Sequence, residues 1–221
     1  MAAAAVTGLE AEARIVRHFG LAAAASGGVA ARTAALAESF LRDGASPVLS
    51  FGIAGALAPR LASGTLLLPQ SVIAESGQCY SVDEATRARL AQALMKAGLT
   101  VESGAIFGAA QAAATADAKA ALFRATGALA IDLESHIVAA AAGQAQQPFL
   151  VLRAIADPAS RSLPSAAIHG LDEKGRPALG RVLREIMRDP RQIPALLRLA
   201  GETRRALAML RLALQSGVRF I

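Results

Sequence analysis

The chain has 221 residues, of which 54% are hydrophobic and only 4% aromatic, and its formal net charge is +6. This length and composition provide a large aliphatic core, which excludes disorder and favours one domain spanning residues 1–221. No apolar run reaches the roughly 18 residues of a membrane-spanning helix. The first residues lack the basic segment of a signal peptide. The single cysteine, Cys79, excludes an internal disulfide and a thiolate metal cluster. We therefore expect a cytoplasmic protein in which Cys79 is a small buried side chain.

The positive charge is concentrated near the end of the chain. Residues 1–160 carry 11 Lys/Arg against 12 Asp/Glu, whereas residues 161–221 carry 12 against 5. Such a segment is typical of nucleic-acid binding, of contact with an anionic membrane, or of a solvated helix face. Neither interleaved aromatic residues nor zinc-ligand spacing accompanies it, so we expect no nucleic-acid partner. The other two alternatives remain, because an apolar stripe flanked by arginines also suits peripheral membrane contact.

The predicted elements alternate between short apolar runs and helical periodicity, which indicates an α/β sheet followed by a helical C-terminal extension at about 179–215. Ser81 and Glu84 have the spacing of a capping box at the start of one helix, and Pro69 indicates an irregularity in one strand. The predicted strands are 2–8, 21–25, 47–57, 64–73, 100–110, 128–133 and 148–156. The predicted helices are 10–19, 29–42, 81–98, 115–126, 135–145, 179–187 and 194–215.

Carboxylates and a glycine turn lie at several of the predicted strand ends. Glu12 follows the first strand, the turn "FGIAGAL" ends the strand at 47–57, and Asp132 and Glu134 end the strand at 128–133. Asp157 ends the last strand, because the following proline removes a backbone donor. Ligands of open α/β sheets bind at the carboxyl ends of the strands. These segments therefore predict one site for a small polar ligand that carries hydroxyl groups.

These blocks resemble the nucleoside phosphorylase/nucleosidase superfamily, which includes purine nucleoside phosphorylases and methylthioadenosine/S-adenosylhomocysteine nucleosidases. The resemblance covers roughly residues 5–160 and depends on Glu-x-Glu at 10–12, on "SFGIAGALAP" followed by "GTLLLP", and on "AIDLES…PFLVLRAIADP". It implies a three-layer α/β/α fold with a central mixed sheet. More narrowly, "LVLRAIADPASRSLP" and the arginine-rich end resemble the members associated with hopanoid biosynthesis, whose proposed role is to remove adenine from adenosylhopane.

The resemblance implies a role for each matching carboxylate. Asp157 would protonate purine N7 as the glycosidic bond breaks, Glu134 together with Leu133 would bind the ribose, and Glu12 would orient or deprotonate an attacking water. The turn at Gly52, Ile53 and Gly55 would contact the sugar or the nucleophile. This chemistry requires neither a metal nor an organic cofactor, although phosphate could serve as a co-substrate.

The purine is expected near Phe107, Gly108 and Gln111. Gln111 stands where the family has an aromatic residue that stacks on the base, and Phe107 is the nearest aromatic alternative.

Further departures from the family concern the nucleophile. Ile53 replaces a serine, Ser50 replaces the phosphate-binding arginine of hexameric phosphorylases, and Ala156 replaces the serine before the acid. "SGGVAAR", with Gly28 and Arg32 at the start of a helix, offers a substitute anion site. Phosphate and water therefore both remain possible nucleophiles.

Structural alternatives accompany the functional ones. Asp157 could simply cap a turn, Glu134 could form an ion pair with Arg153, and Asp132 is expected to be structural and to face away from Glu134. The alternative function is a non-catalytic nucleoside- or lipid-binding adaptor on the same fold. Family members are dimers, trimers or hexamers, and we expect a homo-oligomer, with a dimer favoured.

Overall fold

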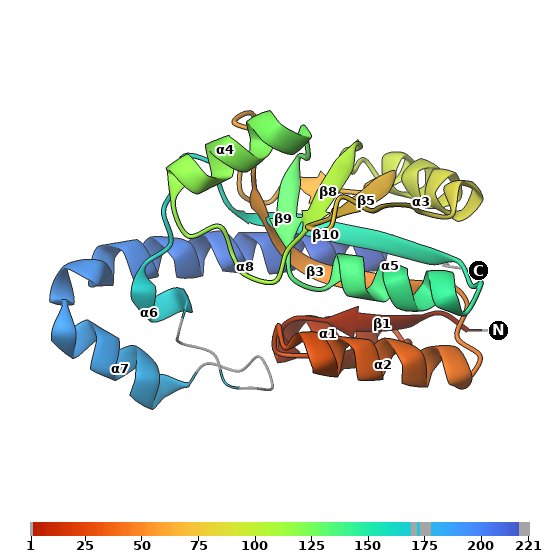
Figure 1. Cartoon of the computed structure of the whole chain (residues 1–221), viewed down its shortest axis with the longest axis horizontal. Coiled ribbons are helices and arrows are strands. Elements are labelled where there is room, and N and C mark those ends of the chain that lie inside the picture. Colours follow the sequence, from red (N-terminus) through yellow and green to blue (C-terminus); the bar gives the residue numbers. More distant parts are fainter. Residues whose placement is uncertain (1, 169–171, 173–177, 217–221) are drawn as a thin grey trace.

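The structure, a computed structural model of the chain, describes residues 2–168, 172 and 178–216. It confirms the predicted α/β fold, in which a central mixed sheet lies between helices and is followed by a long C-terminal helix (Figure 1). Within the described residues, no helix is both long and apolar enough to cross a membrane.

Ten strands form the sheet of the described residues. Their bounds are β1 Ala4–Thr7, β2 Ala22–Ala25, β3 Val48–Ala56, β4 Leu66–Leu67, β5 Ser71–Ala74, β6 Cys79–Ser81, β7 Val101–Glu102, β8 Ala105–Gly108, β9 Ala130–Asp132 and β10 Phe149–Asp157.

The helices agree with the predicted ones within a few residues, apart from a four-residue helix, α6, in a segment expected to be loop-rich. Their bounds are α1 Glu10–His18, α2 Ala30–Arg42, α3 Glu84–Lys96, α4 Ala116–Thr126, α5 Ser135–Gln144, α6 Ser165–Ile168, α7 Leu179–Arg188, the short 3-10 helix Pro190–Gln192 and α8 Ile193–Gln215.

The long parallel strands β3 and β10 form the centre of the sheet, and Arg153 on β10 lies opposite Gly52 on β3. On its other edge, β3 pairs with two strands at different positions along its length. β1 pairs with its first residues and β9 with its last two, Gly55 and Ala56. In the described part of the chain, residues 51–54 of β3 therefore have no strand beside them on that edge.

Alternation along the strands separates the two helical layers. Ala5 of β1 belongs to a core cluster that includes Leu210 of α8, whereas Val6 belongs to a cluster with Ala37 of α2 and Val138 of α5. Successive side chains of a strand point to opposite faces of the sheet. Accordingly, α1 and α8 pack on one face of β1, and α2 packs with α5 on the other.

Two predicted strands, 64–73 and 100–110, are each divided in two. β4 and β5 are separated at Pro69, and β7 and β8 are separated at Gly104, whose φ is +148°. The two breaks lie side by side, because the N–H of Gln70 donates to the C=O of Gly104 at 2.8 Å. β7 pairs with β4 and β8 with β5, so the broken strands change neighbours together.

Two local predictions are wrong. Ser81 does not cap α3, because it is the last residue of β6; instead Asp83 accepts a hydrogen bond from the N–H of Thr86 at 2.8 Å. Asp83 directly precedes the helix, which is where a side chain reaches the third helical N–H. Cys79 is exposed rather than buried, because it lies on the short strand β6 at the end of the sheet path.

Candidate active site

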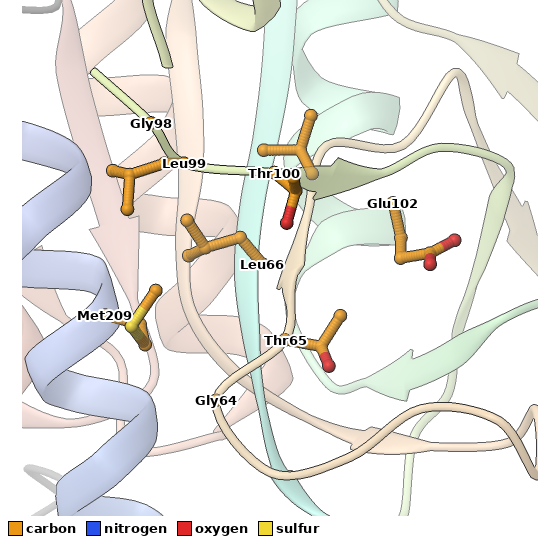
Figure 2. Close-up of a pocket in the computed structure, with 9 residues that line it drawn as sticks. Gly64, Thr65, Leu66, Gly98, Leu99, Thr100, Glu102 and Met209 are labelled. Carbon is orange, nitrogen blue, oxygen red and sulfur yellow. The ribbon is translucent and has the colours of Figure 1, made fainter. Parts of the chain in front are cut away.

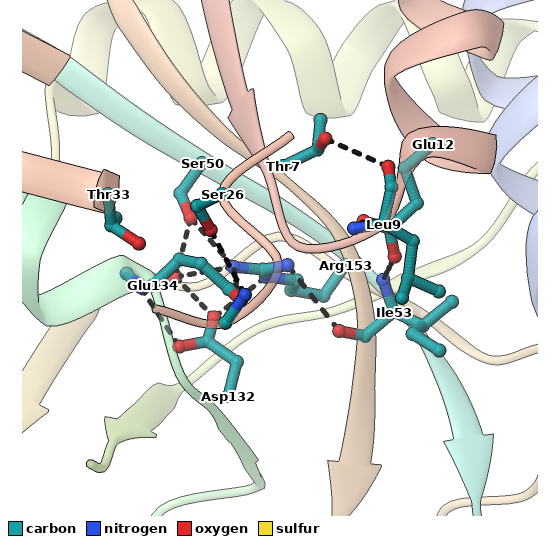
Figure 3. Close-up of polar contacts among 12 residues, drawn as sticks. Thr7, Leu9, Glu12, Ser26, Thr33, Ser50, Ile53, Asp132, Glu134 and Arg153 are labelled. Atoms are coloured by element: carbon teal, nitrogen blue, oxygen red, sulfur yellow. Dashed lines mark hydrogen bonds and ion pairs between the residues drawn. The ribbon is translucent and has the colours of Figure 1, made fainter. Parts of the chain in front are cut away.

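The interruption in strand pairing beside β3 provides the setting of the site. Both backbone groups of Ile53 point toward this edge: its N–H donates to Glu12 Oε1 at 2.8 Å, and its C=O accepts from Arg153 Nη1 at 3.4 Å. Buried backbone groups require partners, and here side chains replace a neighbouring strand. The gap thus brings a carboxylate and a guanidinium to the predicted glycine turn (Figure 3).

Glu12 is held in the first turn of α1 and is only 1% exposed. Its Oε2 accepts the N–H of Leu9 at 2.7 Å, which caps the helix, while Oε1 accepts the N–H of Ile53. Burial raises the pKa of Glu12 from 4.5 to about 7, against the opposing effects of Arg153 and the two backbone donors. A carboxyl group with this pKa can take up a proton near neutral pH.

Arg153 lies at the centre of the polar cluster and is 1% exposed. Its Nη2 donates to Ser50 Oγ at 2.7 Å and to Glu134 Oε2 at 3.0 Å, and its Nε forms an ion pair with Asp132 Oδ2 at 2.7 Å. Removing one partner of a buried ion pair typically costs about 3–5 kcal/mol. The guanidinium therefore fixes the carboxylates of two different segments beside β3.

Glu134 forms the expected alternative contact with Arg153, but only through Oε2. Its Oε1 lies close to two loops, since a Cβ at Gly8, between β1 and α1, would be 2.7 Å from it and a Cβ at Gly28, between β2 and α2, would be 4.0 Å away. Burial raises the pKa of Glu134, whereas Arg153 opposes that rise. The ion pair is therefore compatible with a second contact of this carboxylate.

The expectation that Asp132 faces away from Glu134 is wrong. β9 ends at Asp132, and Glu134 lies beyond the strand, directly before α5, so the strand alternation does not apply and both side chains contact Arg153. Asp132 also accepts the N–H of Ser135 at 3.0 Å and the hydroxyl of the same residue. These contacts support the structural role expected for Asp132, because they fix the start of α5.

Asp157 belongs to a second cluster at the end of β10. It is 7% exposed, and its Oδ2 is paired with the ammonium of Lys119 from α4. A Cβ at Gly55 would lie 3.2 Å from Oδ2 and 3.3 Å from Oδ1. Burial raises the pKa of Asp157, and Lys119 opposes that rise.

The predicted glycine turn is wrong, because Gly52 and Gly55 lie within the continuous strand β3, and this part of the strand connects the two clusters. A Cβ at Gly52 would be 2.6 Å from Glu12 Cδ and 2.7 Å from Arg153 Nη1, and the φ of Gly52 is +155°, which side chains rarely permit. Gly55, three residues later, has the corresponding position beside Asp157. Both glycines are therefore explained by the close approach of charged side chains.

The three residues predicted to bind the base have different surroundings in the structure. Gly108 approaches His136 so closely that a Cβ would lie 2.5 Å from His136 Cβ, and Gln111 is exposed. Phe107 is buried in a cluster with Leu57 and Ile131. The structure therefore brings Gly108 next to α5, the helix that follows the predicted ribose residues, whereas Phe107 contributes to the core.

The two residues of the predicted anion site, Gly28 and Arg32, also have different surroundings. A Cβ at Gly28 would be 3.4 Å from Leu133 Cδ1, so Gly28 adjoins the predicted ribose segment. Arg32 is half-buried near the start of α2. Among the described residues, no group of three or more His, Cys, Asp or Glu side chains is arranged to hold a metal ion.

Sequence reasoning missed two cationic residues. Arg153 has a detectable signal, because it is a charge within an otherwise apolar strand, but the sequence predicts it only as an ion-pair partner of Glu134. Lys119 has none, because it occurs in an alanine-rich helix.

A separate hollow of about 300 Å³ lies between α8 and the strands β4 and β7 (Figure 2). None of the predicted site residues borders it, so it does not correspond to the predicted site. Its lining consists of Gly64, Thr65, Leu66, Gly98, Leu99, Thr100, Val101, Glu102 and Met209.

The fold and the buried carboxylates around the glycines of β3 agree with the nucleoside phosphorylase and nucleosidase type. The family model of the phosphorylase superfamily matches residues 12–188, and the chain belongs to this superfamily. This confirms the predicted family and places the chain in an enzyme class. No curated protein matches it in a sequence search.

Solved structures share the fold across nearly the whole chain. A 5′-methylthioadenosine/S-adenosylhomocysteine nucleosidase from Neisseria meningitidis has a TM-score of 0.74 at 17% identity, covering 97% of both chains. Futalosine hydrolase of Helicobacter pylori has a TM-score of 0.73 at 16% identity, covering 98% of this chain and 96% of its own. An S-adenosylhomocysteine nucleosidase from Streptococcus pyogenes has a TM-score of 0.71 at 18% identity, covering 97% and 96%. At these identities the comparison establishes the fold.

Proposed function

We propose that the protein cleaves the N-glycosidic bond of a purine nucleoside and releases adenine. The observation that supports this most strongly is the buried group at the gap beside β3, where Glu12 and Glu134 flank Arg153. Structurally similar proteins include a nucleosidase for methylthioadenosine and S-adenosylhomocysteine and a futalosine hydrolase. The hydrolytic activities in the names of these proteins are of the kind that these side chains can perform.

The proposed reaction begins at the leaving base. Asp157 donates a proton to purine N7 while the electrons of the C1′–N9 bond move into the ring. Glu134 accepts hydrogen bonds from the ribose hydroxyls, and its negative charge stabilises the positive charge that develops on the sugar. The attacking oxygen then forms a bond to C1′ from the face opposite the base.

Water is the nucleophile that the site supports best. Glu12, whose pKa is raised to about 7, can accept the proton that water loses on attack. Ser50, which stands in place of the arginine of hexameric phosphorylases, has its hydroxyl engaged by Arg153. Phosphate bound near Gly28 and Arg32 remains the alternative, and the experiment below includes it.

The finer proposal concerns the substrate, which we take to be adenosylhopane or a related adenosyl-lipid. It is supported by the resemblance of the segment around Asp157 to hopanoid-associated members and by an exposed surface on α7 and α8. Leu183, Met187 and Leu197 are 58%, 70% and 70% exposed. Exposed arginines accompany them, including Arg198. Such a surface suits peripheral contact of a cytoplasmic homodimer with an anionic membrane from which the lipid is taken.

The test incubates the purified protein with adenosine, methylthioadenosine and an adenosyl-lipid, with and without phosphate, and measures free adenine by chromatography. We expect release from the adenosyl-lipid without phosphate. Asp157→Asn should suppress release while the circular dichroism spectrum is unchanged, and Asp117→Asn, at an exposed position of α4, serves as the matched control.

Two results would contradict the proposal. Turnover of the Asp157→Asn protein at the wild-type rate would exclude Asp157 as the acid. If no substrate gave adenine but the lipid bound, the non-catalytic adaptor would be the better interpretation. A requirement for phosphate would replace hydrolysis by phosphorolysis and would direct mutagenesis to Arg32.

A further inference from the structure

Lys119 is a lysine buried within the fold. It lies on α4 and is 1% exposed, although most of that helix is alanine or solvent-exposed polar residues. Burying an ammonium group is costly unless it is paired and hydrogen-bonded. Its position therefore requires partners that compensate for the loss of water.

The ammonium has three hydrogen-bond partners. It donates to Asp157 Oδ2, to the C=O of Pro158 at 3.1 Å and to the C=O of Arg161 at 2.8 Å. An ammonium group has three donors and no acceptor, so the three oxygens match its three protons. These three contacts therefore account for all three protons of the charged ammonium group.

All three partners belong to the end of β10 and the loop that follows it. Lys119 consequently fixes both the Asp157 side chain and the backbone after it. Because Oδ2 is engaged, Oδ1 is the oxygen left for another partner. Gly55 is close to both oxygens, which restricts the carboxyl group from the side of β3.

From this geometry we propose that Lys119 is a positioning residue for the acid step, whose ammonium orients Asp157 and stabilises the charge left on it when the purine takes the proton. This inference is based on the proposed function. The proton moves from Asp157 to N7, the C1′–N9 electron pair moves to the base, and Lys119 keeps its three protons throughout. Asp157 recovers a proton from solvent after the products leave.

The electrostatic environment agrees with this role. Burial raises the pKa of Asp157, which lets the group hold a proton, whereas Lys119 lowers it and makes the group a stronger acid. The charge of Arg161 also lowers the pKa of Asp157, in the same direction as Lys119. An opposite charge at this distance typically shifts a carboxyl pKa by about 1–3 units.

The experiment compares Lys119→Met, which removes the charge, with Lys119→Arg, which keeps it. The alkaline limb of kcat/KM should move to higher pH by at least about one unit in Lys119→Met, because Asp157 then stays protonated longer, and kcat at the plateau should fall. Lys119→Arg should return the limb toward its wild-type position. A structural role alone would lower activity at every pH and leave the limb where it was.

A second measurement does not depend on turnover. Titration of the Asp157 carboxyl carbon by NMR, assigned with the Asp157→Asn protein, should show the same upward shift in Lys119→Met. An unchanged titration would overturn the inference even if the wild type releases adenine, whereas a shifted titration without adenine release would contradict only the proposed function. If Lys119→Met did not fold, Lys119→Gln would replace it, and failure of both to fold would also overturn the inference by making the ion pair a requirement of the fold.

Discussion

Replacement of Glu12 by glutamine should change how the stability of the protein depends on pH. Glu12 is fully buried, and its folded pKa of about 7 lies above the value of 4.5 expected without burial. A group whose pKa is raised on folding contributes stability that is complete below the lower pKa and is lost as the pH rises through the higher one. The window for this group is therefore pH 4.5 to about 7.

The size of the expected stability change follows from the raised pKa of Glu12 and from its two hydrogen bonds. The rise to about 7 corresponds to about 3 kcal/mol. Glutamine cannot follow this titration, and its NH₂ group would face one of the N–H donors that the carboxylate accepts, at a cost of about 1–3 kcal/mol. Glu12→Gln should therefore be less stable than the wild type at pH 5 and should equal or exceed it at pH 8.

Urea unfolding at several pH values measures the difference directly. The free energy of unfolding of the wild type minus that of Glu12→Gln should fall by about 2–3 kcal/mol between pH 5 and pH 8. Other titrating groups largely cancel in this difference. A difference that is flat, or that rises with pH, would refute the raised pKa. Adenine release should fall by about 10²–10⁴-fold if Glu12 is the base.

Two further substitutions test the local geometry. Gly52→Ala should destabilise the protein by about 1–3 kcal/mol in urea unfolding, because its Cβ would lie 2.6 Å from Glu12 Cδ; Gly143→Ala, which meets nothing within 4 Å, is the control and should cost nothing. Asp83→Ala should lower stability by about 1 kcal/mol through loss of the helix cap, whereas Ser81→Ala should have little effect. Equal costs for the two members of either pair would contradict the assignment of the clash or of the cap.

Patterns that are local in the sequence predicted most of the fold. Apolar runs gave the central strands, and the proline after Asp157 ended the last of them at the right place. The divided strands were missed because they depend on which strands lie side by side, and Ser81 does not cap α3 because it pairs with Ser71 as the last residue of β6. Pro69 indicated an irregularity, but only the adjacent break at Gly104 explains how β4 and β5 separate.

The sequence by itself also predicted which carboxylates are unusual, since Glu12, Glu134 and Asp157 occur at strand ends within apolar surroundings. Their cationic partners were decided by the tertiary structure. Arg153 reaches Glu134 across 19 residues of sequence, and Lys119 reaches Asp157 across 38. Such pairs depend on the order and register of strands, above all on the gap that β1 and β9 leave beside β3, and no local propensity specifies this. The chain therefore specifies its charged residues locally, whereas folding determines which charge each of them meets.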